Sequence, residues 1–569
     1  MLATDSKRAG LMSEKLGIPE QLCSILLQRG FTEEDAHHFL YPKLEQLPSP
    51  SLMKGLESAV SLILQARAEG RMIVVYGDYD VDGVTSTALL SGFLAGIGAQ
   101  VCYYHPDRLD DGYGLSSSSV ENIVSRHPRS LIVTVDCGIS DYKPIQTAKE
   151  NELSVIIVDH HVPPEQLPKA DAIIDPLQEG CNFPFKYLAG VGLVFYLIIG
   201  LRGKLREDGF WTHETQPNLK ELLDLVAIGS VADMVPLVDL NRVLVKAGLD
   251  AINNKSTRRK CLSVLFQICN IADKEIVTED IGFQLGPRIN AAGRLGNAGE
   301  ATQLLMCDDQ KLSYELAERL NATNERRKIM TEAQASQALD MAKRQVAQGR
   351  KVIILHHSDW HNGLIGIIAS RVCEATNKPV IVLAGTPIAK GSARTTNSCN
   401  IYELLNYCNG SLIQFGGHKM AAGLTVKVSN IPAFTELAET YAEQMNLSNH
   451  AEELLVDSIL PPGGHGKLFY EKYKLLGPFG AGNTEPKFMT EKPSYLRNIQ
   501  LIGKNKDHLK FTMEIYGDKL TGVGFGFGHL ADRLAAQKAS FVFSISENWF
   551  KGNKNWQLVL HDIDFPDLQ

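Results

Sequence analysis

Short apolar runs alternate with helix-like stretches between residues 71 and 158, and this alternation limits the folds open to the chain more than any other feature. The apolar runs are Met72–Tyr76, Val101–Tyr104, Leu131–Val135 and Val155–Val158. The helix-like stretches between them are Thr85–Ala95, Ser116–Ser125 and Tyr142–Glu150. A strand–helix repeat of this kind predicts a parallel sheet with helices over both faces. We therefore expect an α/β domain in this part of the chain.

Acidic and histidine side chains stand directly after three of these apolar runs. The first run leads into YGDYDVDG, the third ends at Asp136, and the fourth ends in DHH, with the residues Asp78, Asp80, Asp82, Asp159, His160 and His161. Ligands of open parallel sheets bind at the carboxyl ends of the strands. Five aspartates and two histidines should therefore converge on one edge of the sheet. A further acid, Asp233, ends the helical apolar stretch LVAIGSVAD, and Pro236 follows it closely.

Three acids within one short loop have two readings. They are solvated by water, or they hold a cation, because closely spaced like charges repel and are costly to bury. The acids and histidines after the other strands favour the cation. Imidazole and carboxylate without thiolate suits manganese, or magnesium with fewer nitrogen contacts. So many ligands exceed one octahedron, which predicts two divalent ions roughly 3.5–4 Å apart, with Asp136 placed to bridge them.

Size and composition set broad limits. A chain of 569 residues is too long for one core, and three or four domains are expected. The net charge of −8 neither favours nor excludes nucleic acid, because a local basic groove can exist on an acidic chain. Ten scattered cysteines without a C-x-x-C pair fit a reducing cytoplasm. The start of the chain has no apolar signal core, and the run Leu188–Leu201 is too short to span a membrane.

The remaining pattern divides the chain into five segments. Residues 1–69 are predicted to be helical, and 70–308 hold the first α/β domain, in which LGPRINAAGRLG (285–296) is interpreted as a loop near an anion. Residues 309–348 contain no Gly or Pro and predict a connecting helix of about 60 Å, with a break considered at 321–324. A second, smaller α/β domain is expected over 349–450 and a β-rich small barrel over 453–569.

Several of these motifs form an ordered series that resembles a known family. GDYDVDG, VTVDCGIS, IIVDHH and GSVADMVPL look like the motifs of the DHH phosphoesterase superfamily, and FGGHKMAAG (415–423) looks like the signature of its companion DHHA1 domain. Within that superfamily the sequence most resembles the RecJ branch of bacterial single-strand-specific 5′→3′ DNA exonucleases, and LLGPFGAGNTEPKF with the β-rich tail extends the likeness. The resemblance implies a DHH domain over 70–308, a DHHA1-type domain over 349–450 and an OB-like domain over 453–569.

The resemblance also implies roles for the residues at the predicted edge. One metal would take Asp78 and Asp80, and both metals would share Asp136. The other metal would take Asp82, His160 and Asp233. Asp159 would orient a histidine, and His161 would contact the scissile phosphate, so that His161, Asp159 and Asp136 are the expected catalytic residues. Many relatives carry histidine where this chain has Tyr76, which leaves the first site short of a nitrogen ligand.

A second group of residues is expected to bind DNA. The resemblance assigns the 5′-terminal phosphate to Arg108, Ser392 and Arg394, whereas an ion pair with Asp110 or Asp111 is the alternative for Arg108. The other candidates for substrate contact are Arg288, Asn290, Arg294, His361 and His418, although the first three also suit a structural loop at a domain junction. In the tail, Trp549, Phe550 and Trp556 are candidates for base stacking, and alternation indicates that some of them belong to the core.

The expected function is a single-stranded-DNA-specific 5′→3′ exonuclease that releases 5′-mononucleotides by two-metal hydrolysis with Mn²⁺ or Mg²⁺. The resemblance places such an enzyme in DNA repair and recombination in the cytoplasm, as a monomer, beside a helicase and a single-strand-binding protein. A cleft too narrow for two strands would exclude duplex. Two alternatives stay open: a DHH phosphodiesterase or phosphatase acting on short oligonucleotides or nucleotides, and a non-catalytic single-strand-binding scaffold.

Overall fold

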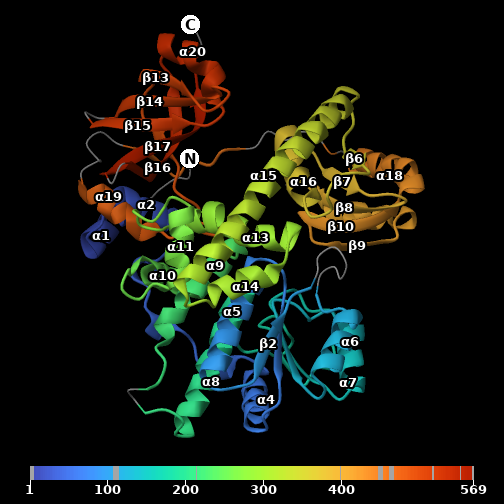
Figure 1. Cartoon of the computed structure of the whole chain (residues 1–569). Helices are drawn as coiled ribbons and strands as arrows, with labels where there is room; N and C mark the ends of the chain where they lie inside the picture. The colour runs from blue at the N-terminus through green and yellow to red at the C-terminus, as the bar shows by residue number, and fades with distance from the viewer. Residues whose placement is uncertain are drawn as a thin grey trace.

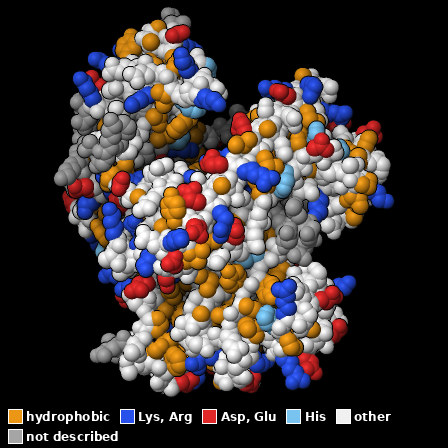
Figure 2. Space-filling view, in the orientation of Figure 1, with side chains coloured by type: hydrophobic (Ala, Val, Ile, Leu, Met, Phe, Trp, Pro, Cys, Tyr) orange, Lys and Arg blue, Asp and Glu red, His pale blue; other side chains and the backbone are white. Residues whose placement is uncertain are grey.

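Three β-sheets, each built from its own region of the chain, organise the protein (Figure 1). The computed structural model describes residues 6–106, 114–212, 215–396, 399–445, 447, 453–460, 467–515, 518–550 and 553–566. Figure 2 shows this face in space-filling form, with a hollow between the C-terminal sheet region and the second α/β region. Within the described residues, every helix is too short or too polar to cross a membrane.

The first sheet is parallel throughout and has the order β2-β1-β3-β4-β5. Its strands are β1 (Ile73–Gly77), β2 (Val101–Tyr104), β3 (Leu131–Val135), β4 (Ser154–Val158) and β5 (Ala172–Ile174). The central strands β1 and β3 are buried along their whole length, as their continuous apolar runs predict for a sheet covered on both faces. The predicted α/β domain is confirmed, and β5 is an additional strand that the sequence pattern did not reveal.

Helices cover both faces of this sheet. One face packs against α4 (Leu56–Ala68), α5 (Val81–Gly96), α8 (Gly190–Glu207) and α9 (Leu223–Ala232), and the other packs against α6 (Ser117–Arg126) and α7 (Tyr142–Glu150). Helix α5 begins four residues before the predicted start at Thr85, because Asp80 caps its first turn. As a result Asp82 lies in a helix and not in the loop that follows β1.

Residues 285–295 are helical, and the interpretation of 285–296 as a loop is wrong. A π-helical turn over Ile281–Leu285 runs into α13 (Gly286–Leu295). The glycines allow close packing here rather than a turn: a Cβ on Gly293 would collide with the backbone oxygen of Tyr79. Helix α13 therefore lies directly against the segment that carries the first acids.

One continuous helix, α15 (Gln310–Ala347), connects the first two sheets, and the break considered at 321–324 is absent. Its 38 residues correspond to about 57 Å at 1.5 Å per residue. It packs against α11 (Lys260–Ile268), α13 and α14 (Ala298–Leu305) at one end and against α16 (Ile365–Thr376) at the other. Figure 1 shows it running diagonally from the first α/β region to the second.

The second sheet is mixed and has the order β6-β7-β8-β10-β9. Its strands are β6 (Ile353–His357), β7 (Val380–Ala384), β8 (Ile388–Arg394), β9 (Gln414–Gly417) and β10 (Ala421–Lys427). Helices α16, α17 (Ile401–Tyr407) and α18 (Ile431–Gln444) complete this region. In β8, Ser392 pairs with Gly423 and Arg394 pairs with Ala421, so small residues stand beside both polar side chains on the β10 side.

The third sheet has seven strands in the order β11-β12-β16-β17-β15-β14-β13. The strands are β11 (Ser458–Leu460), β12 (Phe488–Thr490), β13 (Leu496–Ile502), β14 (His508–Ile515), β15 (Asp518–Gly524), β16 (Ser540–Phe550) and β17 (Asn553–Asp564), with the short helices α19 (Lys467–Tyr473) and α20 (Ala531–Ala536). The N-terminal helices α1 (Ser6–Leu16), α2 (Glu20–Gln28) and α3 (Glu33–Leu40) share its apolar core, and Figure 1 shows the two ends of the chain on the same side of the molecule.

A buried arginine joins three regions of the chain. Arg242 on α10 (Asp239–Asn253) donates hydrogen bonds to the carbonyl oxygens of Phe39 (2.8 Å), Leu476 (3.1 Å) and Gly477 (2.6 Å). Its guanidinium also lies 3.6 Å from the centroid of the Phe39 ring. Because these partners come from the N-terminal helices and from the segment leading into the C-terminal sheet, Arg242 fixes both against the first α/β region.

Candidate metal centre

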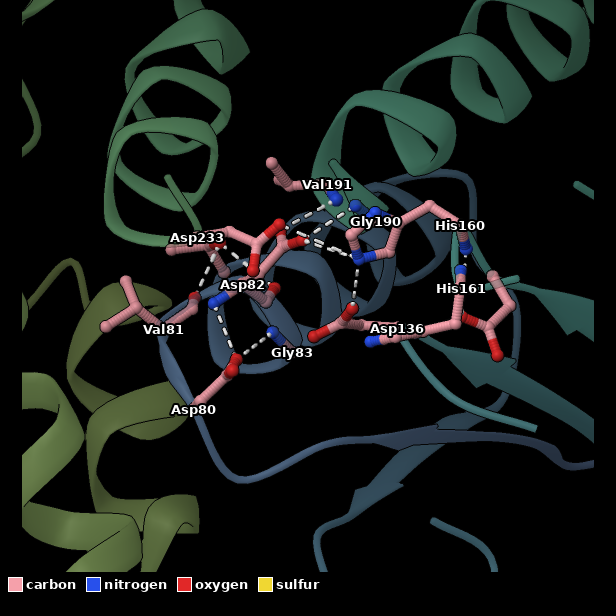
Figure 3. A network of polar contacts seen from close by, with 12 residues as sticks. Asp80, Val81, Asp82, Gly83, Asp136, His160, His161, Gly190, Val191 and Asp233 are labelled. Atoms are coloured by element: carbon pink, nitrogen blue, oxygen red, sulfur yellow. Dashed lines mark hydrogen bonds and ion pairs between the residues drawn. The ribbon is translucent and has the colours of Figure 1, made fainter. Parts of the chain in front are cut away.

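The acids after β1 are each placed by a different backbone feature, and Figure 3 shows the surroundings of Asp80 and Asp82. Asp78 is buried directly after the strand. Asp80 is the N-cap of α5, where its Oδ1 accepts hydrogen bonds from the N–H groups of Asp82 (2.9 Å) and Gly83 (3.1 Å). The carboxylate of Asp82 accepts from the N–H groups of Gly190 (2.6 Å) and Val191 (2.9 Å), at the N-terminus of α8. The positive end of that helix favours the negative charge.

His160 stands at the centre of the cluster. Its Nε2 lies 3.1 Å from Oδ1 of Asp136, 3.7 Å from Oδ2 of Asp233 and 3.9 Å from Oδ2 of Asp82. Figure 3 shows these side chains directed at one another from β1/α5, β3, β4 and the end of α9. Asp136 has a φ of +61°, a left-handed conformation that non-glycine residues rarely adopt and that is often retained at functional sites.

Asp159 is directed toward its own neighbours along the chain. Its Oδ1 lies 2.7 Å from Nδ1 of His161 and accepts a hydrogen bond from the backbone N–H of His160, and its Oδ2 accepts from the N–H of Ile139. Burial alone would lower the pKa of His161, but the hydrogen bond and the charge of Asp159 outweigh it and raise that pKa to about 9. The pKa of Asp159 is lowered, because its partners, His161 first, outweigh the opposing effect of burial.

The ligand atoms fall into two groups that suit two cations. Oxygen atoms of Asp78, Asp80 and Asp136 lie within 4.8 Å of one another, and we call these residues the carboxylate cluster. Asp82, His160 and Asp233 satisfy the same limit, and we call them the imidazole cluster. Asp136, His160 and His161 form a third such group, so that Asp136 and His160 link the two clusters.

The pKa values of the acids in both clusters indicate that the site favours positive charge. Burial first, and then the neighbouring carboxylates, raise the pKa of Asp82 to about 7, that of Asp233 to about 8 and that of Asp136 well above its ordinary value. Burial and the charge of His161 lower the pKa of His160 to about 4, which leaves a neutral imidazole able to bind a metal. A divalent cation would offset the repulsion among these acids, and the oxygen and nitrogen donors fit manganese or magnesium.

Tyr76 on β1 precedes Asp78 by two residues, and His105 follows β2 directly. The buried ring of Tyr76 packs among the residues under α6, and its hydroxyl lies 3.2 Å from the carbonyl oxygen of Gly114. This side chain therefore fills the core. His105, which the sequence did not single out, lies 2.9 Å from the carbonyl oxygens of both Gly77 and Asp78. Burial lowers its pKa to about 4 against the effect of those two hydrogen bonds.

A cavity of about 850 Å³ lies beside the metal centre, between the second sheet and the segment after β1. Ser392, Arg394 and Arg294 line it together with Tyr79, the residue between Asp78 and Asp80 of the metal centre. Nη1 of Arg394 donates to Oγ of Ser392 at 2.9 Å. Gly366 keeps the space open, because a Cβ there would lie 3.2 Å from Nη2 of Arg394. Lys390 and Asn362, which the sequence did not single out, also line the cavity.

The other predicted substrate residues lie outside this lining. Arg288 is 7% exposed, and its guanidinium donates to Asn321 on α15 (3.0 Å) and to the carbonyl oxygen of Gln284 (2.7 Å), which directs it into a helix interface. Asn290 is half-buried on α13, one turn before Arg294. His361 lies in the segment before α16, and His418 is exposed in the turn between β9 and β10. Arg108 lies outside the described residues.

The tail aromatics do not form one surface. Trp556 stacks on Tyr470 with ring centroids 4.7 Å apart and packs against the core of the C-terminal sheet, which places it among structural residues. Trp549 is half-buried near the end of β16, with Nζ of Lys554 5.4 Å from its ring centroid. Phe550 ends β16, and its side chain lies outside the described part of the chain.

Another acid follows the additional strand. Asp175 stands directly after β5, where it is fully buried and accepts a hydrogen bond from the N–H of Leu177 at 2.7 Å. Burial raises its pKa to about 7, with a smaller contribution from the charge of Asp159. It occupies the strand end next to the one that carries Asp159, so it extends the row of acids along the sheet edge.

Comparison with known proteins agrees with this geometry. Family models described as DHH family, N-terminal domain, DHHA1 domain and RecJ OB domain match residues 72–230, 349–444 and 456–562. The single-stranded-DNA-specific exonuclease RecJ of Bacillus subtilis (strain 168) is 36% identical over 582 aligned residues, which cover 99% of this chain and 70% of that protein.

Two solved structures are similar over nearly the whole chain. Crystal structures of RecJ from Thermus thermophilus, in complex with Mn²⁺ and with Mg²⁺, each match 99% of this chain. The TM-scores are 0.82 and 0.77, the identities 30% and 28%, and the matches cover 78% and 77% of those chains. The predicted fold class, two α/β domains followed by an OB-like domain, is thereby confirmed.

Proposed function

The chain belongs to the RecJ family of single-stranded-DNA-specific exonucleases, and we propose that it removes mononucleotides from the 5′ end of single-stranded DNA by metal-dependent phosphodiester hydrolysis. The observation that carries the proposal is that the metal centre and the cavity beside it adjoin each other. The carboxylate cluster includes Asp78 and Asp80, and the residue between them, Tyr79, lines the cavity that contains Ser392 and Arg394. A phosphate bound in that cavity would therefore lie near the acids that hold the metals.

Two divalent cations, Mn²⁺ or Mg²⁺ as in the Thermus thermophilus complexes, are assigned to the two clusters. One would be held by the carboxylate cluster and the other by the imidazole cluster, with Asp136 shared. Bound there, the cations lower the pKa of water and neutralise charge on the phosphoryl oxygens. The chain's own contribution is to hold five carboxylates and one neutral imidazole in place before substrate arrives.

His161 is assigned to the scissile phosphate. The hydrogen bond and charge of Asp159 raise its pKa to about 9 in the metal-free protein, which favours a protonated ring suited to contact with phosphoryl oxygens. Asp159 fixes the ring through the 2.7 Å contact to Nδ1, and the backbone N–H groups of His160 and Ile139 fix Asp159 in turn. Asp159 therefore holds the protonated ring of His161 in a fixed position beside the metal ligands.

The 5′ end is assigned to the cavity under β8. Arg394 offers the forked donors that suit a terminal phosphate, Ser392 adds a hydroxyl, and Arg294 reaches the same space from α13. Small residues opposite both side chains, Gly423 and Ala421, leave room for the strand's backbone. Arg108 is proposed as a further phosphate ligand on the family pattern, and Asn290, His361 and His418 as contacts farther along the strand.

The C-terminal sheet is proposed to bind the strand beyond the cleft. Trp549 is the residue best placed to stack on a base, since Trp556 is engaged with Tyr470. We further propose that the protein acts as a monomer in the cytoplasm, on strands opened by a helicase and held by a single-strand-binding protein. The ten cysteines, none of which forms a disulfide, support a reducing compartment.

The test is digestion of a long single strand labelled at either end, with Mn²⁺ or Mg²⁺ and with or without a 5′ phosphate. We expect labelled mononucleotide from the 5′ end first, faster with the phosphate. Arg394→Ala should lose most of that preference, mainly through KM, by about 10–100-fold. The matched control is Arg371→Ala, because Arg371 is on α16 and pairs with Glu332 at the surface.

Three outcomes would contradict the proposal. Release from the 3′ end would reverse the polarity, and efficient digestion of blunt duplex would remove the strand specificity. A preference for a dinucleotide over the long strand would instead favour the small-substrate phosphodiesterase.

A further inference from the structure

The ladder between β1 and β2 ends beside the carboxylate cluster, and a side chain continues it. The last paired residues are Tyr76 and Tyr104. His105 and Pro106 come next, and proline has no N–H to donate. The carbonyl oxygens of Gly77 and Asp78 instead lie 2.9 Å from Nδ1 of His105.

The protonation of this imidazole is fixed from both sides. Both partners of Nδ1 are carbonyl oxygens, which only accept, so Nδ1 carries the proton. Nε2 lies 2.7 Å from Oγ1 of Thr302, whose hydroxyl can donate to it. Thr302 is fully buried on α14, the helix that packs against α5. His105 therefore connects the segment that carries Asp78 to α14.

We propose that His105 is a positioning residue for metal binding: through Gly77 and Asp78 it holds the backbone so that the Asp78 carboxylate stays directed at the carboxylate cluster. The inference rests on the proposed function, since it assumes that this cluster binds a cation. The N–H of Asp78 makes a longer backbone contact, 3.4 Å from the carbonyl oxygen of Val135. The imidazole adds two shorter contacts, one to the peptide on each side of Asp78.

The carboxylate cluster has the greater need for such support. It contains no imidazole, whereas the imidazole cluster is held by His160 and by the α8 backbone through Asp82. Loss of a group that orients a metal ligand without touching the metal typically lowers metal affinity by about 10–100-fold. Loss of the His105 contacts should therefore weaken one of two binding events and leave the other.

The experiment is calorimetric titration of the DNA-free protein with Mn²⁺. Wild-type protein should bind two ions, and His105→Ala should weaken one step by about 10–100-fold. His105→Asn, whose amide can still donate to the two carbonyls, should recover most of that loss. Thr302→Val should weaken the same step less, and Thr302→Ser should match wild type. His127→Ala is the control, a histidine that also touches β2, 3.3 Å from the hydroxyl of Tyr104.

Cleavage rates separate positioning from general damage. His105→Ala should lower kcat at fixed Mn²⁺ while KM for DNA changes little, and raised Mn²⁺ should restore part of the rate. Thermal unfolding identifies any variant that fails to fold, in which case Thr302→Val carries the test. If both steps in the folded variants stay within about twofold of wild type, less than the effect of ligand-orienting groups, the inference is wrong. If wild-type protein binds no Mn²⁺, the proposed function fails instead.

Discussion

The two halves of the metal centre offer different atoms to a cation. The carboxylate cluster presents oxygen alone, whereas the imidazole cluster adds the Nε2 atom of His160. Both draw on the same short stretch after β1, because Asp78 and Asp80 belong to one cluster and Asp82 to the other. The start of α5 between Asp80 and Asp82 is what separates them.

The clusters also differ in how the chain supports them. Asp82 receives two N–H groups from the start of α8, so the backbone of another helix orients it. Asp80 receives two N–H groups from its own helix and serves as N-cap and candidate ligand at once. The imidazole cluster is therefore supported by the backbone of a second helix, whereas Asp80 in the carboxylate cluster also has a structural role.

Removing the shared ligand should erase the difference between the clusters. Asp136→Ala takes an oxygen from both, and we expect kcat to fall at least about 10³-fold because cleavage needs both ions. Calorimetry should show weaker binding at both steps, and binding of a 5′-phosphorylated strand, measured by fluorescence anisotropy, should persist through the Arg394 cavity. Unchanged cleavage would refute the assignment of Asp136 to both metals.

Replacing the nitrogen ligand should make the two clusters alike. His160→Asp gives an all-oxygen set, and we expect the ratio of activity in Mn²⁺ to activity in Mg²⁺ to fall about tenfold or more, because oxygen ligands suit magnesium. His127→Ala is the control, since it removes a histidine away from the centre. A ratio unchanged from wild type would mean that His160 does not set the metal preference.

Metal binding by the imidazole cluster should depend on pH. Burial and neighbouring carboxylates raise the pKa of Asp82 to about 7 and of Asp233 to about 8, so both acids are protonated in metal-free protein below about pH 7. A cation must displace those protons, and the affinity of the imidazole cluster should rise up to about tenfold per pH unit for each proton, levelling off above about pH 8. Titrations in buffers of different ionisation enthalpy would count the protons released.

The same pKa shifts predict the direction in which the free energy of unfolding changes with pH. The folded metal-free protein binds these protons more tightly than the unfolded chain does, because the pKa of Asp82 and Asp233 is raised above 3.8. Their contribution to the free energy of unfolding should therefore fall as pH rises from about 4 through about 8. The lowered pKa values of His105 and His160 act in the opposite direction, but only between about pH 4 and 6.5. Saturating Mn²⁺ should reverse the loss, and a metal-free protein that gains stability between about pH 6.5 and 8 would contradict the raised pKa values.

Topology explains why the sequence predicted so much of the centre. Three apolar runs followed by acids suffice to place Asp78, Asp136 and Asp159 at one edge, because parallel strands end together. The strand β5 has only three residues, too few for a periodic signal, so Asp175 escaped notice. His105 gave no pattern either, since a single histidine before Pro106 becomes meaningful only once the β1–β2 ladder is known to end there.

Tertiary packing explains the one error and decides what local patterns left open. The glycines of residues 285–296 indicated a loop, yet Gly293 is there because α13 packs against the backbone of Tyr79. Arg288 suited either a DNA contact or a structural role, and its helix directs it toward Asn321. Alternation indicated that some tail aromatics belong to the core, and Trp556 stacks on Tyr470. In each case the partner lies far away in sequence or on another element, so local patterns carried no signal.

The smallest effect should separate the two roles of Asp80. Asp80→Asn keeps a good N-cap for α5 and removes a charge from the carboxylate cluster, whereas Asp80→Ala removes both. Each should weaken one Mn²⁺ step by about tenfold or more, while the imidazole cluster keeps its ligands.

Without metal, both variants lose the repulsion that Asp80 exerts on Asp82, Asp136 and Asp233. Only Asp80→Ala also leaves the N–H groups of Asp82 and Gly83 without their acceptor, so it should be less stable than Asp80→Asn by about 1 kcal/mol in urea unfolding of the metal-free protein. Equal stabilities would mean that water replaces the cap at no cost and that Asp80 serves the metal alone.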